Sequence, residues 1–231
     1  MKNKSIITVL ILIISILSLK AQKVEIRQIS PFNKVQISGN FNVELVKGNS
    51  GEVKIISEDI NPTEIVTELS DNTLKVKMNS KLDVFKDIDV DIFITYKELK
   101  SITANASADI VIKDTITSNN FHAKATSAAD IELITKIENI ELTVLQGAQI
   151  IISGDVNKQE SYVNTGGILS ATNLQCNEVF IKINTGGKAE VVANELIDAS
   201  VNTGADLSYY GKPKQEKIKN NLGGTISKWD E

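Results

Sequence analysis

The feature that most constrains the fold is a four-residue motif that recurs every 18 to 21 residues through the second half of the chain. In each copy the first two positions are Gly, Ala or Ser, and the fourth position is apolar. Self-similarity at this period is typical of a solenoid, in which each repeat stacks on the next. The seven copies begin at Ser107, Ala128, Gly147, Gly166, Gly186, Gly204 and Gly223.

Apolar and polar residues alternate on both sides of each motif, which is the pattern of strands with one buried face. The sequence therefore predicts an all-β fold, a parallel β-helix or β-solenoid with rungs of about 19–20 residues. We expect the small residues to form the bends, because larger side chains would collide with neighbouring rungs and glycine supplies positive φ. Gly166→Val or Gly186→Val should then destabilise the fold by a few kcal/mol, on the order of other strained-backbone changes. The glycines expected at bends are Gly147, Gly166, Gly167, Gly186, Gly187, Gly204, Gly223 and Gly224.

A column of asparagines accompanies the bends. Stacked amides about 4.8 Å apart can donate and accept hydrogen bonds along the stack. The alternative is a polar groove that binds a ligand, but the ladder needs no additional molecule. Asn184→Ala should weaken a buried ladder by about 1–3 kcal/mol. The column consists of Asn105, Asn164, Asn184, Asn202 and Asn221.

Residues 22–100 repeat less clearly but are also rich in predicted strands, at 35–37, 41–45, 53–55, 74–78 and 88–94. Asn61 and Pro62 predict the start of a short helical turn. No linker separates this part from the repeats at 101–231. We therefore expect one domain over residues 22–231, in which the β-rich N-terminal region caps or begins the stack.

Residues 1–21 have a basic start followed by an apolar run of 14 residues, which predicts a signal peptide. An uncleaved N-terminal anchor is the alternative. Cleavage changes the net charge from −4 to −7, because three lysines are removed. We expect an exported protein in the periplasm, on the outer surface or outside the cell, with no integral membrane span after cleavage. The acidic balance disfavours a nucleic-acid partner.

Several segments resemble the bacterial head GIN domain family of auto-transporter adhesins. The resemblance covers roughly residues 30 to 212, and the motif that gives the family its name is imperfect, at 39–42. It implies a β-helical exported domain and a role in adhesion, and it carries over no catalytic residue. The segments that carry it are 37–45, 74–76, 94–102, 106–109 and the later Thr-Gly-Gly and Thr-Gly-Ala bends.

The composition excludes several kinds of chemistry. Cys176, His122 and Arg27 are the only residues of their types, so no internal disulfide, Cys/His zinc site or multi-histidine centre can form. His122 is expected on a strand surface, and Cys176 in a loop or partly buried turn. We expect no cofactor and no catalytic residue. Asp109 and Asp130 occupy equivalent positions on neighbouring rungs and are weak candidates for calcium.

These observations predict an exported, non-enzymatic β-solenoid that acts as an adhesin-like or envelope binding module for a glycan or protein at the cell surface. One alternative is a polysaccharide-active enzyme, a lyase or a glycosidase, because many parallel β-helices cleave polysaccharides. The single arginine and the negative balance speak against a lyase that grips acidic substrates. The other alternative is a purely structural envelope protein.

Overall fold

The computed structural model describes residues 22–79 and 89–229. The predicted signal peptide at 1–21 lies outside these residues, as do Asp230, Glu231 and the first residue of the strand predicted at 88–94. The described chain has one short 3₁₀ helix, η1 (Pro62–Glu64), and 18 strands. The strands are β1 (Lys23–Ile29), β2 (Lys34–Ser38), β3 (Asn42–Lys47), β4 (Gly51–Ser57), β5 (Ile65–Ser70), β6 (Thr73–Met78), β7 (Val90–Tyr96), β8 (Ser101–Asn105), β9 (Asp109–Ile112), β10 (Asn120–Thr126), β11 (Asp130–Leu145), β12 (Gln149–Asn164), β13 (Ile168–Ile183), β14 (Lys188–Val192), β15 (Leu196–Asn202), β16 (Asp206–Tyr210), β17 (Gln215–Asn221) and β18 (Thr225–Trp229).

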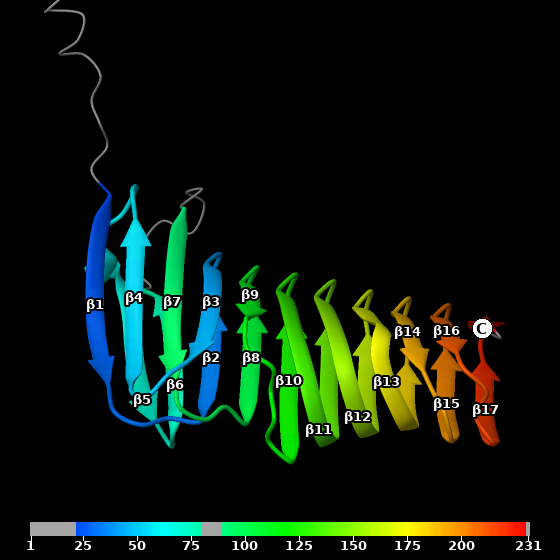
Figure 1. The fold of residues 1–231 in the computed structure, drawn as a ribbon. Helices are drawn as coiled ribbons and strands as arrows, with labels where there is room; N and C mark the ends of the chain where they lie inside the picture. The colour runs from blue at the N-terminus through cyan, green and yellow to red at the C-terminus, as the bar shows by residue number, and fades with distance from the viewer. Residues whose placement is uncertain (1–21, 80–88, 230–231) are drawn as a thin grey trace, which may run out of the picture.

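The strands form one hydrogen-bonded sheet that winds into a solenoid (Figure 1). From β8 onward, each rung consists of two strand segments that meet at a corner. Each segment pairs in parallel with the equivalent segment of the next rung. The long strands β11, β12 and β13 run from the second segment of one rung into the first segment of the next. The predicted β-solenoid is confirmed.

The N-terminal region contributes rungs out of chain order. β2 pairs in parallel with both β6 and β8, and β3 pairs in parallel with both β7 and β9. The rung formed by β2 and β3 therefore lies between strands that follow it in the sequence (Figure 1). Beyond β6 and β7 the sheet continues in antiparallel pairs, which join β4 to β7, β1 to β4 and β5 to β6. The predicted capping region is present, and this crossover is its unexpected feature.

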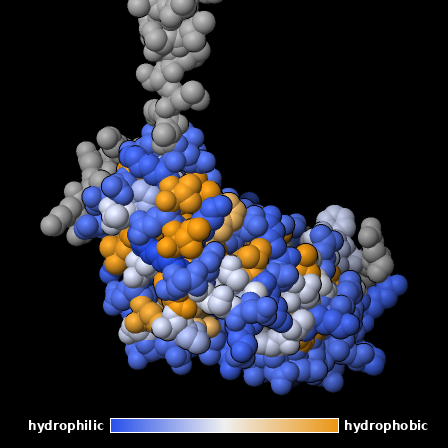
Figure 2. Space-filling view, turned by 60° about the vertical axis from the view of Figure 1, so that its left-hand side comes forward, coloured by the Kyte–Doolittle hydropathy of each residue, from blue (hydrophilic) through white to orange (hydrophobic). Residues whose placement is uncertain are grey.

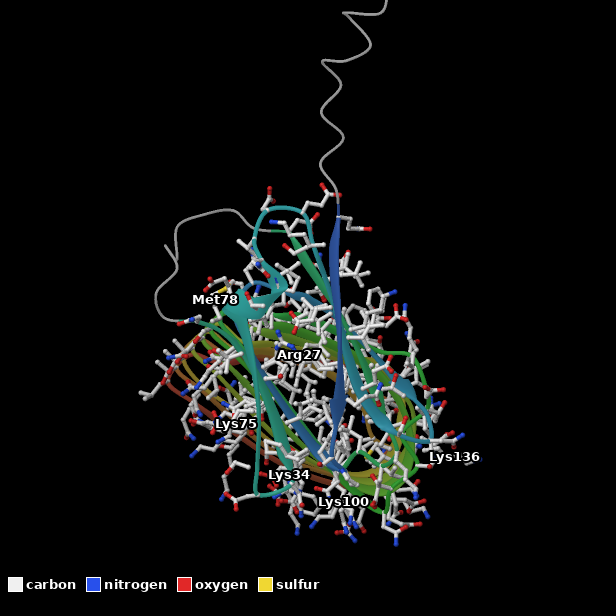
Figure 3. All side chains as sticks on the ribbon, turned by 90° about the vertical axis from the view of Figure 1, so that its left-hand side faces the viewer. Arg27, Lys34, Lys75, Met78, Lys100 and Lys136 are labelled. Carbon is white, nitrogen blue, oxygen red and sulfur yellow. The ribbon has the colours of Figure 1, made fainter. Side chains whose placement is uncertain are left out.

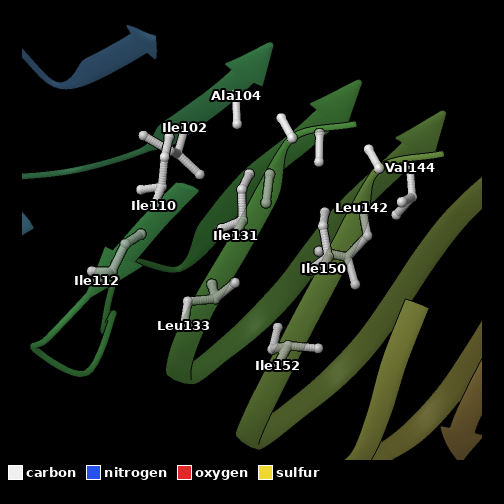
Figure 4. Close-up of a cluster of buried hydrophobic side chains, with 14 of the residues drawn as sticks. Ile102, Ala104, Ile110, Ile112, Ile131, Leu133, Leu142, Val144, Ile150 and Ile152 are labelled. Atoms are coloured by element: carbon white, nitrogen blue, oxygen red, sulfur yellow. The ribbon is translucent and has the colours of Figure 1, made fainter. Parts of the chain in front are cut away.

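The interior is filled by columns of aliphatic side chains, one from each rung (Figure 4). Ile110, Ile131 and Ile150 share one register position and are each at most 1% exposed. Such stacking buries nearly all the inward apolar surface, and this burial is the main stabilising term of the fold. Another column, that of Leu142 and Ile181, contains buried Ser161, whose hydroxyl accepts a hydrogen bond from Gln159 Nε2 at 2.9 Å.

Arg27 closes the N-terminal end of the solenoid (Figure 3). Its guanidinium donates to the carbonyl oxygens of Ile65, at 2.6 Å, and Pro62, at 2.9 Å. It also bonds Glu25 at 2.9 Å, and this contact lowers the pKa of the Glu25 carboxyl. The helical turn predicted at Pro62 is confirmed, since η1 begins there with the side chain of Asn61 accepting from the Thr63 amide. Arg27 thereby ties β1 to η1 and β5.

The surface of the N-terminal end carries hydrophobic side chains among hydrophilic ones (Figure 2). On β1, Val24 is 53% exposed and Ile26 is 57% exposed. At the other end, Ile218 and Ile226 of the last rung are only partly buried against the core. Within residues 22–79 and 89–229, no helix has the length and hydropathy needed to cross a membrane.

Candidate functional site

The corners between the two strand segments of each rung share one backbone conformation. At the corner after β12, Thr165 and Gly166 have φ values of 51° and 71°, and the Gly167 amide donates to the Asn164 carbonyl at 3.1 Å. Two successive positive φ values closed by such a bond are typical of a type I′ turn. The pairs with positive φ are Ala106 and Ser107, Ser127 and Ala128, Gln146 and Gly147, Thr165 and Gly166, Thr185 and Gly186, Thr203 and Gly204, and Leu222 and Gly223.

The two small positions of the motif have different physical requirements. A Cβ added at Gly166 or Gly186 would meet no atom within 4 Å, so the expected crowding at these two residues is wrong. Their positive φ is what favours glycine. At the next position, a Cβ on Gly167 would lie 2.5 Å from the Val144 carbonyl oxygen, so crowding acts there. Close contacts also surround Gly187 and Gly224, whereas Gly147, Gly204 and Gly223 resemble Gly166.

The predicted asparagine column is a hydrogen-bonded chain over three rungs only. Asn221 Nδ2 donates to Asn202 Oδ1 at 2.9 Å, and Asn202 Nδ2 donates to Asn184 Oδ1 at the same distance. Asn164 instead donates to the Tyr162 hydroxyl at 3.1 Å and accepts from the Thr165 amide. At the other end of the column, Asn105 lies at the register position of Thr126, and its side chain joins no hydrogen bond within the described residues.

Two further asparagine pairs lie near the opposite corner, where the long strands turn. Asn139 Nδ2 donates to Asn120 Oδ1, and Asn177 Nδ2 donates to Asn157 Oδ1, both at 2.9 Å. Sequence reasoning missed these pairs. Their separations of 19 and 20 residues match the repeat, so the same period would have revealed them.

The calcium candidates Asp109 and Asp130 are register partners on adjacent strands, and both are exposed. Partial desolvation and the Asp109 charge raise the pKa of the Asp130 carboxyl. Asn42 is the register partner of Asp109 on the other side, but its side-chain amide donates to Asp91 Oδ1 at 3.1 Å. Among the described residues, no group of three or more His, Cys, Asp or Glu side chains is arranged to hold a metal ion.

We give the name outer strand face to the outward surface of β2, β8, β10, β15, β17 and the second halves of β11, β12 and β13, which pair side by side. It contains a shallow groove of about 430 Å³ across four rungs. Two register columns line this groove. The first is Glu141, Glu160, Phe180 and Asp198, and the second is Thr143, Tyr162, Lys182 and Ser200.

Two aromatic rings lie in the groove as diagonal neighbours on adjacent strands. Tyr162 is 37% exposed, and Phe180 is half-buried beneath Lys158, whose Nζ lies 5.0 Å from the ring centroid. Around them stand carboxylates and hydroxyls that point into solvent. Apolar ring surfaces bordered by hydrogen-bonding groups match ligands that have both kinds of surface, as sugars do.

A family comparison agrees with this architecture. The model for the family described as "Putative auto-transporter adhesin, head GIN domain" matches residues 31–213. The chain belongs to the head GIN domain family. Among proteins with curated descriptions, none matches this head GIN domain significantly.

Solved structures share the head GIN fold at low sequence identity. A "putative adhesin" from Bacteroides fragilis has a TM-score of 0.84 and 20% identity, over 91% of this chain and 98% of that chain. A "putative adhesin" from Parabacteroides merdae has a TM-score of 0.71 and 18% identity, over 91% and 97%. A "Putative lipid binding protein" from Parabacteroides distasonis also has a TM-score of 0.71 and 18% identity, over 91% and 98%. These likenesses show the fold.

The single histidine and cysteine of this head GIN domain lie apart. His122 is exposed on β10, as predicted, and its Nδ1 lies 2.8 Å from Glu141 Oε2. Cys176 does not lie in a loop or turn as expected, because it is an inward residue of β13 with no exposed surface. Burial raises the pKa of its thiol to about 12, so the reactive thiolate is not available at neutral pH.

Proposed function

We propose that this head GIN domain is an exported, non-enzymatic binding module that attaches to glycan or protein at the cell surface through its outer strand face. The observation that carries the proposal is the groove in which Tyr162 and Phe180 lie among solvent-facing carboxylates and hydroxyls. Rings held on a rigid sheet lose little conformational freedom when they bind a ligand. The family name supports the adhesin-like role.

The geometry of the carboxylates favours binding over catalysis. Glu160 contacts the Lys158 ammonium, and Glu141 contacts the His122 imidazole, so each carboxylate already has a partner on the surface. The groove is open to solvent, whereas glycosidases pair carboxylates with separate roles set by different environments. Both glutamate side chains are more than half exposed, so the two carboxylates share one solvent-facing environment.

Sedimentation of the mature protein with cells or extracellular matrix tests the proposal. We expect Tyr162→Ala combined with Phe180→Ala to reduce the bound fraction about tenfold, because stacking surface at the centre of the groove is lost. The matched control is Tyr210→Ala combined with Trp229→Ala, which removes two stacked aromatic residues on other strands. Equal binding by both double variants would exclude the groove as the binding site.

The same preparations test the enzymatic alternative. We expect no release of reducing ends or unsaturated products from polysaccharides incubated with the protein. Cleavage that disappears in Glu141→Gln or Glu160→Gln would show that the outer strand face is catalytic, and the non-enzymatic part of the proposal would fail.

A further inference from the structure

A second groove on the outer strand face is basic, although the chain as a whole carries a net charge of −4. This groove has a volume of about 520 Å³. Its walls include Lys34 from β2 and Lys124 from β10, and Lys100 stands at the start of β8. We name it the lysine furrow. Figure 3 shows Lys34 and Lys100 on one side of the molecule, with Lys75 beside them.

The furrow exists because short side chains lie between long ones. Ser101 of β8 has Lys34 and His122 as its register partners on the two adjacent strands. Thr103, two residues along β8, is likewise opposite Lys124. Two strand spacings separate β2 from β10, which places the two walls about 10 Å apart. The floor therefore offers hydroxyl groups, and the walls offer ammonium groups.

The walls have spare positive charge. Neither Lys34 nor Lys124 has a carboxylate within 4.0 Å among the residues that the structure describes. Lys100 has a partner in Glu98 at 3.2 Å, and both side chains are more than half exposed. The one carboxylate lining the furrow, Glu141, contacts His122. An anion entering the furrow would gain two unshared cations without displacing an internal ion pair.

The furrow is continuous with the groove that contains Tyr162 and Phe180, which we name the aromatic groove, because Glu141 and Thr143 line both. Successive rungs are about 4.8 Å apart, which is close to the length of one sugar unit in an extended polysaccharide. A chain lying along the outer strand face would therefore present one unit to each rung. Its charged unit would meet the lysines, and the units two and three rungs beyond Lys124 would lie against Tyr162 and Phe180.

Resting on the proposed binding function, we propose that the lysine furrow binds an acidic polysaccharide, with a carboxylate or sulfate group held between Lys34 and Lys124. The hydroxyls of Ser101 and Thr103 hydrogen-bond the sugar that carries this group. The acidic remainder of the protein restricts polyanion binding to the furrow, because it repels polyanions elsewhere on the surface.

Binding of polyglucuronate and dextran sulfate by isothermal titration calorimetry tests the proposal, with uncharged dextran as the reference. We expect Lys34→Gln combined with Lys124→Gln to weaken the tighter of the two about tenfold and to reduce the dependence of affinity on salt. The matched control is Lys217→Gln combined with Lys219→Gln, which removes the same charge from β17 on the same face. Unchanged melting temperatures would show that all variants are folded.

Preference for polyglucuronate assigns the furrow to carboxylates, and preference for dextran sulfate assigns it to sulfates. Equal loss in both double variants, equal binding of uncharged dextran, or tighter binding of duplex DNA or phosphatidylglycerol vesicles would overturn the proposal. The outcome is separable from the proposed function. If Lys34→Gln with Lys124→Gln still sediments with cells while the Tyr162 and Phe180 variant does not, the furrow fails and the binding module stands.

Discussion

Three threonines at the corners of the solenoid adopt a backbone conformation that β-branched residues rarely adopt. Thr165, Thr185 and Thr203 have φ values between 49° and 52°. Hydrogen bonds between successive corners hold them there. The Gly166 amide donates to the Thr185 carbonyl at 3.1 Å, and the Gly186 amide donates to the Thr203 carbonyl at 3.2 Å. The stack therefore compensates for local backbone strain.

Substitution at Gly166 separates the conformational requirement from crowding. We expect Gly166→Val to lower the free energy of unfolding by about 2 kcal/mol, because valine resists positive φ. Gly166→Asn should lower it by less than about 1 kcal/mol, since asparagine tolerates that conformation. Chemical denaturation measures both. Similar losses for the two variants, whose side chains are of comparable size, would show that crowding dominates after all.

The glycine positions were predictable from the repeat, but their division into two physical classes was not. Gly166 and Gly167 are equivalent as small residues in a sequence pattern. Only the backbone places the Cβ of one in open space and the Cβ of the other against a carbonyl oxygen. The threonine conformation was also beyond sequence reasoning, because it opposes the local preference and depends on contacts with other rungs.

At the scale of strands, the asparagine chain links three rungs and ends at Asn184. Asn202 is its central member, and it also donates to Ser200 Oγ at 3.1 Å. The polar side chains thus add directional bonds between strands that are otherwise joined by backbone pairing and apolar contact. They fix the relative register of the last rungs, where apolar burial is weakest.

We expect Asn202→Ala to lower the free energy of unfolding by about 1–2 kcal/mol, because two amide contacts and one hydroxyl contact are lost. Asn184→Ala removes one contact and should have a smaller effect. Asn105→Ala is the matched control, and a change within about 0.5 kcal/mol is expected for it. Thermal melting followed by circular dichroism measures all three. An Asn202→Ala protein as stable as the control would contradict the ladder.

Most strands were predictable because apolar residues alternate along them, although β1 and β5 were not among the predicted strands. Their order in space was not. The rung of β2 and β3 lies between β6–β7 and β8–β9, and such parallel pairing between distant segments leaves no local pattern. The lysine furrow depends on this crossover, since it brings Lys34 beside Ser101. The aromatic groove, in contrast, could be derived by aligning the outward positions of successive repeats.

At the scale of the whole molecule, the two ends of the solenoid differ. The N-terminal end finishes in antiparallel strands closed by Arg27, whereas the C-terminal end finishes in the parallel segments β17 and β18. The last rung is held by polar contacts, among them Lys228 Nζ to Glu216 Oε1 at 2.8 Å, which lowers the pKa of the Glu216 carboxyl. We therefore expect the free energy of local unfolding to differ between the two ends.

We expect Arg27→Met to accelerate hydrogen exchange of the β1 amides by about tenfold or more, because charged hydrogen bonds to two carbonyls are lost. Exchange in β12 should not change, since it lies several rungs away. Lys23→Met, on the same strand but at an exposed position, is the matched control. Uniform acceleration throughout the chain would instead mean that the N-terminal closure and the rungs open as one unit.

The stacked corners allow the solenoid to be lengthened by whole turns. In the described part of the chain, the backbone of each corner bonds to the neighbouring corners, and each rung pairs with the rungs beside it. Duplicating a segment such as 130–148 would insert one whole turn without disturbing any junction. Both grooves lie on the face that would lengthen. Head GIN relatives can therefore lengthen or shorten this face by adding or losing whole turns. The outward residues of each rung separately determine which ligand groups that rung contacts.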